Sequence, residues 1–235
     1  MVLNDPETGI PLAVMDCTLI TAKRTGAATA VAAKYLARPD SKVIGVIGCG
    51  VQGQSNLEAL LAVQNQITTV FAYDILKHKT EQYIARNEEL FPQIDFIEAN
   101  SPKEAVENSD IIVTAGPIIK DPDQVIEASW FKEGAFASPV DFDSYWKPAA
   151  MKMSNKFCTD DIQQLLYYKS VGYFKDIPGI YADLGEIVAG IKVGRENEKE
   201  HIMSVNLGIA LEDVATAILV YERARQKNIG IELPL

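Results

Sequence analysis

The stretch that most constrains the fold of this chain is residues 43–74, where a short apolar run leads into a cluster of glycines. Residues 43–47 read VIGVI, the sequence Gly-Cys-Gly-Val-Gln-Gly follows directly, and the residues beyond it carry leucines at helical spacing. This order is typical of a strand that ends in a tight turn and passes into a helix. A second β-branched run, residues 67–73, ends at Asp74.

The glycines and the acid match a dinucleotide-binding pattern. Gly48 permits the tight turn, Gly50 lets the backbone approach a pyrophosphate, and Gly53 lets the helix pack closely on the strand. The N-terminus of the helix presents unpaired N–H groups to the anion. The pattern requires a carboxylate for the ribose hydroxyls roughly 20 residues further on, which is the place of Asp74. We therefore predict a dinucleotide site at Gly48, Gly50, Val51, Gln52, Gly53 and Asp74.

Composition excludes several classes of protein. The chain has 235 residues, 48% of them hydrophobic, which is enough for one large domain or two small ones. The net charge of −10 disfavours nucleic-acid binding. No apolar run is long enough to span a membrane and no signal-peptide pattern begins the sequence, so we expect a cytoplasmic protein. Three cysteines without C-x-x-C spacing predict neither a disulfide framework nor a metal site.

The rest of the chain alternates between strand patterns and helix patterns. Such alternation predicts a parallel sheet with right-handed crossovers, which is the α/β, Rossmann-type, doubly wound fold. Further strands are expected at residues 10–15, 94–97, 110–114, 135–137 and 155–158. Helices are expected at residues 18–36, 78–90, 162–169, 184–191 and 206–225, with shorter ones after Pro102 and near Trp146.

The carboxyl ends of the expected strands define a crevice for ligands. Thr114 lies at one of these ends, and Asp141 and Asp143 follow the strand at residues 135–137. If the chain stays extended, the two carboxylates point the same way, and mutual repulsion with partial burial raises the pKa of one toward that of a general acid or base. In the alternative, the segment is a polar loop in which one aspartate caps the helix near Trp146.

Three blocks of sequence resemble the ornithine cyclodeaminase and mu-crystallin family: residues 20–54, residues 182–190 and residues 207–224. The resemblance implies that the glycine turn binds NAD(H) or NADP(H) and that Asp74 holds the adenosine ribose. An acid at this place favours NAD, although Lys77 and Lys79 lie close by in the sequence. The resemblance also implies further cofactor contacts, from Thr25, Thr114, Val140 and Asn206.

The resemblance assigns Arg24 a role in substrate binding, which the helical spacing of apolar residues around it does not indicate. In the family's T-x-x-R-T motif, residues 21–25 here, the arginine lies near the nicotinamide and pairs with the substrate carboxylate, a group that suits a guanidinium. The family's catalytic aspartate corresponds to Asp143. Because this sequence has Asp141 and Phe142 in place of the usual glycines, Asp141 stays a rival for that role.

Members of the family have a longer N-terminal segment, which supplies most of a substrate and dimerisation domain. We therefore expect residues 39–204 to form a dinucleotide-binding domain and residues 1–38 and 205–235 to be the remnant of a second domain. The substrate site is then expected to be incomplete. The apolar faces left uncovered predict a homodimer or a higher homo-oligomer.

The implied reaction is hydride transfer at Cα of a small amino or imino acid, with conversion of ornithine to proline and ammonia as the first hypothesis. Arg24 would orient the carboxylate, and Asp143 would remove and return protons. An amino-acid dehydrogenase and a cyclic-imine reductase use the same parts. A non-catalytic, nucleotide-binding protein of the mu-crystallin kind is a further alternative. No nucleic-acid or membrane partner is expected.

Overall fold

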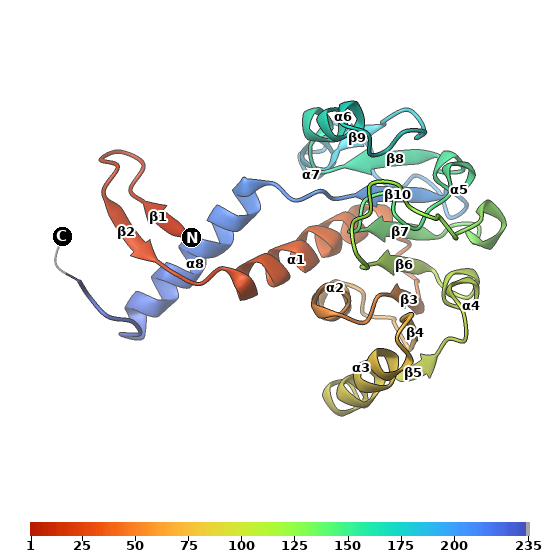
Figure 1. The fold of residues 1–235 in the computed structure, drawn as a ribbon, viewed down its shortest axis with the longest axis horizontal. Helices are drawn as coiled ribbons and strands as arrows, with labels where there is room; N and C mark the ends of the chain where they lie inside the picture. The colour runs from red at the N-terminus through yellow and green to blue at the C-terminus, as the bar shows by residue number, and fades with distance from the viewer. Residues whose placement is uncertain (234–235) are drawn as a thin grey trace.

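The computed structural model describes residues 1–233 and contains an eight-stranded sheet with helices on both faces (Figure 1). Neighbouring strands pair in parallel in the order β5-β4-β3-β6-β7-β10-β8-β9. The strands are β3 (Val43–Ile47), β4 (Thr69–Tyr73), β5 (Asp95–Glu98), β6 (Ile111–Thr114), β7 (Phe136–Pro139), β8 (Lys156–Thr159), β9 (Ala182–Asp183) and β10 (Ile202–Val205).

The order of the strands reverses in the middle of the sheet. The chain runs from β3 outward through β4 to β5, and it then returns to add β6 on the other side of β3. In such folds the ligand crevice lies at the carboxyl ends of the strands that flank this reversal. The predicted α/β, doubly wound fold is therefore confirmed, and the glycine turn that follows β3 lies at the reversal.

Helices cover the two faces of the sheet and enclose two apolar cores. Leu36, Leu57 and Tyr83 belong to the core beneath one group of helices, and Val106 and Met151 belong to the core beneath the other. The first group is α1 (Thr18–Leu36), α2 (Val51–Val63), α3 (Lys77–Leu90) and α7 (Leu184–Val188). The second is α4 (Pro102–Glu107), α5 (Pro148–Lys152) and α6 (Ile162–Ser170).

Helix α1 packs closely against α2, because small residues line its inner side. A Cβ atom at Gly26 would lie 2.4 Å from the carbonyl oxygen of Ser55. The hydroxyl of Ser55 donates a hydrogen bond of 2.5 Å to the carbonyl oxygen of Ala22. Gly26 lowers the helix propensity of α1, but the close approach of α1 to α2 requires it. Helix α2 begins at the glycine turn.

The two ends of the described chain extend away from the sheet (Figure 1). Strands β1 (Val2–Asn4) and β2 (Pro11–Val14) form an antiparallel hairpin, and the hairpin lies near the long helix α8 (Ala210–Gln226). Helix α8 exposes apolar side chains, among them Leu211, which is 71% exposed. The division into residues 39–204 and the two terminal pieces stays a prediction.

Strand β10 was not expected from the sequence. It pairs with both β7 and β8, and it fills the position between them although the chain reaches it after both. The run is only four residues long and includes Ser204, so it has little strand signal of its own. The helix predicted from residue 206 begins only at Ala210, since Gly208 takes a φ of +86° in the loop before it.

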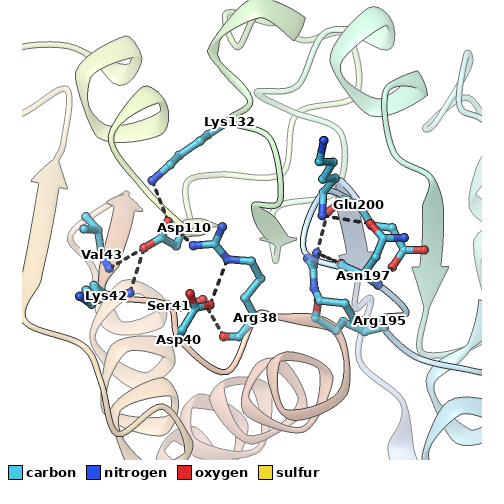
Figure 2. A network of polar contacts seen from close by, with 12 residues as sticks. Arg38, Asp40, Ser41, Lys42, Val43, Asp110, Lys132, Arg195, Asn197 and Glu200 are labelled. Atoms are coloured by element: carbon cyan, nitrogen blue, oxygen red, sulfur yellow. Dashed lines mark hydrogen bonds and ion pairs between the residues drawn. The ribbon is translucent and has the colours of Figure 1, made fainter.

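The amino ends of β3 and β6 are joined by a network of ion pairs and hydrogen bonds around Asp110 (Figure 2). The Asp110 carboxylate accepts the backbone N–H groups of Lys42 and Val43 at 2.9 and 3.1 Å, and it accepts the Lys132 ammonium at 2.7 Å. Arg38 lies 3.4 Å away. Burial raises the pKa of Asp110, but these donors outweigh burial and leave the pKa below its usual value.

Candidate functional site

The three motif glycines differ in what surrounds them. Gly48 has a φ of +99°, its N–H donates to the carbonyl oxygen of Tyr73 at 2.8 Å, and a Cβ there would lie 2.6 Å from the carbonyl oxygen of Ala115. A Cβ at Gly53 would lie 2.1 Å from the carbonyl oxygen of Gly48. A Cβ at Gly50 would meet no atom within 4 Å. Two glycines are therefore required by packing, whereas the middle one leaves its backbone open to an approaching ligand.

The start of α2 has the properties of an anion site. Gly50 is the N-cap residue and provides no side-chain cap, so the first N–H groups of the helix have no acceptor within it. Val51, the first helical residue, is 68% exposed. The side-chain oxygen of Gln52 is buried and accepts no hydrogen bond within residues 1–233. This helix end can therefore receive a pyrophosphate.

Asp74 lies directly after β4, beside the glycine turn. Its carboxylate accepts the backbone N–H groups of Cys49 and Leu76, both at 2.9 Å, which holds the side chain in place. Lys77, which follows, already lies 3.8 Å from the carboxylate of Glu98 and 3.9 Å from that of Glu81. Asp74 is thus fixed beside the glycine turn, and Lys77 is engaged by other acids. This arrangement suits the two ribose hydroxyls of NAD better than the phosphate of NADP.

Asp141 follows β7 and is completely buried. It accepts the hydroxyl of Thr114 at 2.7 Å and the backbone N–H of Gly116 at 2.9 Å, both at the carboxyl end of β6. Burial raises the pKa of Asp141 to about 7, while the two hydrogen bonds oppose the rise and the charge of Asp143 adds the smallest contribution. The raised pKa thus arises mainly from desolvation and only slightly from the repulsion expected between the two carboxylates.

Asp143 faces a different environment, because the chain does not stay extended between the two aspartates. Phe142 has a φ of +63°, which turns the backbone. The carboxylate of Asp143 accepts the backbone N–H of Phe174 at 3.0 Å through Oδ2, while Oδ1 is buried and accepts no hydrogen bond within residues 1–233. Burial raises the pKa of this group as well. Neither aspartate caps α5, whose N-cap is Lys147.

Arg24 lies on α1 and is paired with the first turn of α8. Its Nε atom is 3.0 Å from the carboxylate of Asp213, and its Nη1 atom is 3.3 Å from that of Glu212. A Cβ at Gly208 would lie 2.2 Å from Nη1, so the loop after β10 packs directly on the guanidinium. The neighbouring Thr25 is buried and donates its hydroxyl to the carbonyl oxygen of Thr21.

The remaining predicted cofactor residues follow neighbouring strands. The N–H of Val140, after β7, donates to the carbonyl oxygen of Thr114 at 2.9 Å. Asn206, after β10, is 4% exposed, and its Nδ2 atom is buried without an acceptor in the described chain. The structure therefore brings the glycine turn, Asp74, Thr114, Val140 and Asn206 to one edge of the sheet. No hydrogen bond or ion pair within residues 1–233 connects Arg24 to Asp141 or Asp143.

Several polar residues of this edge were missed from the sequence. Glu212 and Asp213 are the partners of Arg24, and the pKa of Glu212 is raised by burial and by the charge of Asp160. Tyr145 lies against Gly116, where a Cβ would be 2.1 Å from its hydroxyl oxygen. Two neighbouring acids in the first turn of a helix are a signal that could have pointed to Glu212 and Asp213. Their partner, Arg24, could not be found in this way, because it lies 188 or 189 residues earlier in the chain.

Metal-binding clusters and membrane-spanning helices are both absent from residues 1–233. Residues 1–233 contain no group of three or more histidine, cysteine or acidic side chains placed to hold a metal ion. Within the same residues, none of the helices has both the length and the apolar character needed to cross a bilayer.

Comparison with known proteins identifies the family of this chain. The model of the ornithine cyclodeaminase/mu-crystallin family matches residues 1–228. This chain belongs to that family. The resemblance seen in three blocks of the sequence is therefore confirmed over almost the whole length.

Relatives of this family member include two dehydrogenases. N-((2S)-2-amino-2-carboxyethyl)-L-glutamate dehydrogenase from Staphylococcus aureus is 35% identical over all of this chain and 70% of its own length. Alanine dehydrogenase from Archaeoglobus fulgidus is 37% identical over 99% of this chain and 72% of its own. The structure of Thermococcus litoralis Δ1-pyrroline-2-carboxylate reductase in complex with NADH and L-proline is 36% identical, with a TM-score of 0.88 over 99% of this chain and 73% of that one.

Proposed function

We propose that this member of the ornithine cyclodeaminase/mu-crystallin family is an NAD-dependent dehydrogenase or reductase that transfers hydride at Cα of a small amino or imino acid. The observation that carries the proposal is the open backbone at Gly50 beside the anchored carboxylate of Asp74. Relatives with 35–37% identity over nearly the whole chain are oxidoreductases of this kind, which supports the same chemistry here.

The cofactor is NAD(H), which when bound accepts or donates the hydride. Structures of two similar proteins contain it, one with NADH and L-proline and one, an archaeal alanine dehydrogenase, with NAD. In this chain Gly50 and the start of α2 would receive the pyrophosphate, and Asp74 would accept the ribose hydroxyls. The buried Nδ2 of Asn206 is a donor that lacks an acceptor, so it suits a carbonyl group of the ligand.

The cyclodeaminase hypothesis is less well supported than its alternative. Two relatives with 35% and 37% identity are dehydrogenases, and a Δ1-pyrroline-2-carboxylate reductase from Bacillus cereus is 31% identical over 98% of this chain. A solved lysine cyclodeaminase is 27% identical. We therefore favour an amino-acid dehydrogenase or a cyclic-imine reductase over conversion of ornithine to proline.

Substrate binding and proton transfer fall to residues of this chain. Arg24 is proposed to hold the substrate carboxylate, which would have to displace or join Glu212 on the guanidinium. Proton exchange with the substrate amine is proposed for the turn that carries Asp141 and Asp143. Asp143 is favoured by the family resemblance, whereas Asp141 lies against Thr114 and Gly116 at the cofactor edge and has a pKa of about 7.

The test uses both directions of the reaction. We expect the protein to consume NADH with Δ1-pyrroline-2-carboxylate or with pyruvate and ammonium, and to form NADH with L-proline or L-alanine. The absorbance of NADH is recorded over time in each mixture. The amount of proline formed from ornithine in the presence of NAD⁺ tests the cyclodeaminase reaction. Tight NADH binding without turnover of any of these compounds would contradict the proposal and favour a nucleotide-binding protein.

A homodimer is proposed as the assembly. The exposed apolar residues of α8 and of the β1–β2 hairpin need a partner surface, and the similar archaeal alanine dehydrogenase is described as a dimer. Light scattering after size exclusion should give twice the mass of one chain, and a monomer mass at micromolar concentration would refute the assembly.

A further inference from the structure

The two acids in the first turn of α8 contact different nitrogens of the Arg24 guanidinium. Helices α1 and α8 pack against each other (Figure 1), and Asp213 lies 3.0 Å from Nε, while Glu212 lies 3.3 Å from Nη1. Nη2 makes no hydrogen bond or ion pair within residues 1–233, and it is not fully enclosed. Nη1 and Nη2 form a fork that a carboxylate can bind through both of its oxygens. One arm of this fork is therefore held by Glu212, and the other is open.

Glu212 is held only weakly at this position. Its contact of 3.3 Å is longer than the roughly 2.7 to 2.9 Å of a strong charge-assisted hydrogen bond, and its carboxylate makes no other hydrogen bond within residues 1–233. Burial and the charge of Asp160 raise the pKa of Glu212, and the opposing effect of Arg24 does not offset them. The charged form of Glu212 is thus destabilised where it lies, so a carboxylate with better geometry can take its place on the guanidinium.

The backbone around this contact is fixed. The N–H of Gly208 donates to Asp160 at 2.5 Å, and the carbonyl oxygen of Gly208 accepts the side-chain amide of Gln164 at 3.1 Å. A Cβ at Gly208 would lie 2.2 Å from Nη1 of Arg24, so the loop before α8 already rests on the guanidinium. The side chain of Glu212, in contrast, is long, flexible and 20% exposed. A ligand at Arg24 is therefore accommodated by rotation of this side chain and not by a shift of α8.

We propose that Glu212 competes with the carboxylate of a ligand for Arg24, whereas Asp213 is the residue that positions the guanidinium. The ligand carboxylate takes Nη1 and Nη2 together, the side chain of Glu212 rotates away, and Asp213 stays on Nε. This role of Glu212 rests on the proposed binding of the substrate carboxylate at Arg24. Glu212 weakens the binding of a carboxylate ligand, but it keeps the guanidinium paired when no ligand is bound.

The test is calorimetric titration of the NADH-loaded protein with L-alanine and with ethylamine, which lacks the carboxylate. Glu212→Gln should tighten L-alanine binding about threefold to tenfold and leave ethylamine binding unchanged. Glu212→Asp keeps the charge but is shorter by one CH₂ group and cannot reach Nη1, so it should also tighten L-alanine binding. Glu222→Gln, at an exposed position of the same helix, is the matched control and should have no effect.

Asp213→Asn separates the loss of a contact from the loss of a charge. It removes the same charge from the same turn of α8, but the amide oxygen can still accept the Nε–H group of Arg24. We therefore expect L-alanine binding to change by less than about twofold. Equal tightening by Asp213→Asn and Glu212→Gln would show a general effect of charge and would refute the competition.

The outcomes also separate this role from the proposed function. If Arg24→Ala removes L-alanine binding while Glu212→Gln leaves it unchanged, Glu212 does not compete and the carboxylate site stands. If L-alanine does not bind to Glu212→Gln at all, the competition is likewise refuted. If Glu212→Gln tightens binding as expected but no amino or imino acid is turned over with NAD(H), the competition stands and the proposed function fails. Thermal unfolding of each variant shows whether a change in binding reflects a change in folding.

Discussion

Asp110 and Asp141 are both buried, and they lie next to the neighbouring strands β6 and β7. Asp110 lies at the amino ends of these strands, whereas Asp141 lies at their carboxyl ends. Asp110, before β6, accepts a lysine ammonium and two backbone N–H groups, and its pKa is lowered. Asp141, after β7, accepts one hydroxyl and one backbone N–H, and its pKa is raised to about 7. With cationic partners a buried carboxylate stays charged and ties strands together, whereas with neutral donors alone it can gain or lose a proton near neutral pH.

The largest effect is expected from Asp141→Asn, which removes the group that can exchange a proton at the cofactor edge. We expect kcat to fall about 10²- to 10⁴-fold, the usual contribution of a general acid or base. Asp123→Asn, an exposed aspartate in the loop before η1 (Ala128–Trp130), is the matched control. Steady-state NADH assays measure the effect, and turnover within threefold of the parent protein would remove Asp141 from the reaction.

Asp110→Asn should reduce stability with little effect on the chemistry. Loss of the buried charge leaves the Lys132 ammonium without its counter-ion and leaves Arg38 with Asp40 alone, and we expect a loss of about 2 to 4 kcal/mol in the free energy of unfolding. Urea denaturation followed by circular dichroism measures the loss. Asp95→Asn, at an exposed position at the start of the edge strand β5, should change it by less than about 0.5 kcal/mol. Equal stability of the two variants would show that the network at Asp110 is not needed for the fold.

Substitutions at the motif glycines separate packing from ligand binding. Gly53→Ala places a methyl group 2.1 Å from the carbonyl oxygen of Gly48, so we expect the turn to shift and the melting temperature to fall. Gly50→Ala meets no atom within 4 Å, so the fold should be kept while NADH affinity falls about tenfold, since the methyl group occupies the approach of the pyrophosphate. Fluorescence titration with NADH and thermal unfolding test both variants, and unchanged NADH affinity in Gly50→Ala would contradict the site.

The two aspartates should also respond to pH in opposite ways. Because the pKa of Asp141 in the folded protein is about 7 against an ordinary 3.8, the folded state binds the extra proton between these values and stability falls as pH rises through that window. Asp110, with a lowered pKa, adds stability above its ordinary pKa of 3.8, and this stability is lost as pH falls through the folded value.

Asp141→Asn should therefore flatten the fall in stability between about pH 4 and 7, by at most about 1.4 kcal/mol per pH unit. Asp110→Asn should flatten the loss of stability at more acidic pH. Denaturant midpoints taken at intervals of half a pH unit measure both slopes. Identical profiles for the parent protein and Asp141→Asn would mean that Asp141 does not titrate in this range.

Much of the fold was predictable because the elements have strong local patterns. Helix α1 and strand β3 have the predicted bounds, since alternation of small and apolar residues and a β-branched run before glycines are signals within a few residues. The glycine turn was predictable for the same reason. Strand β10 was not, because a four-residue run is identified only by the two strands that it pairs with.

For the site, the sequence by itself determined which residues follow the predicted strands, and so which ones gather at the carboxyl edge of the sheet: the glycine turn, Asp74, Thr114 and Val140. Asn206 was expected only from the family resemblance, because the strand that precedes it, β10, was not predicted. Only the tertiary structure decided that Asp141 and Asp143 face different surroundings, because one positive φ at Phe142 turns the chain between them. It also decided that Arg24 pairs with Asp213, 189 residues further on. Local spacing specifies turns and strand ends, whereas burial and charge partners arise from segments that meet only when the chain is folded.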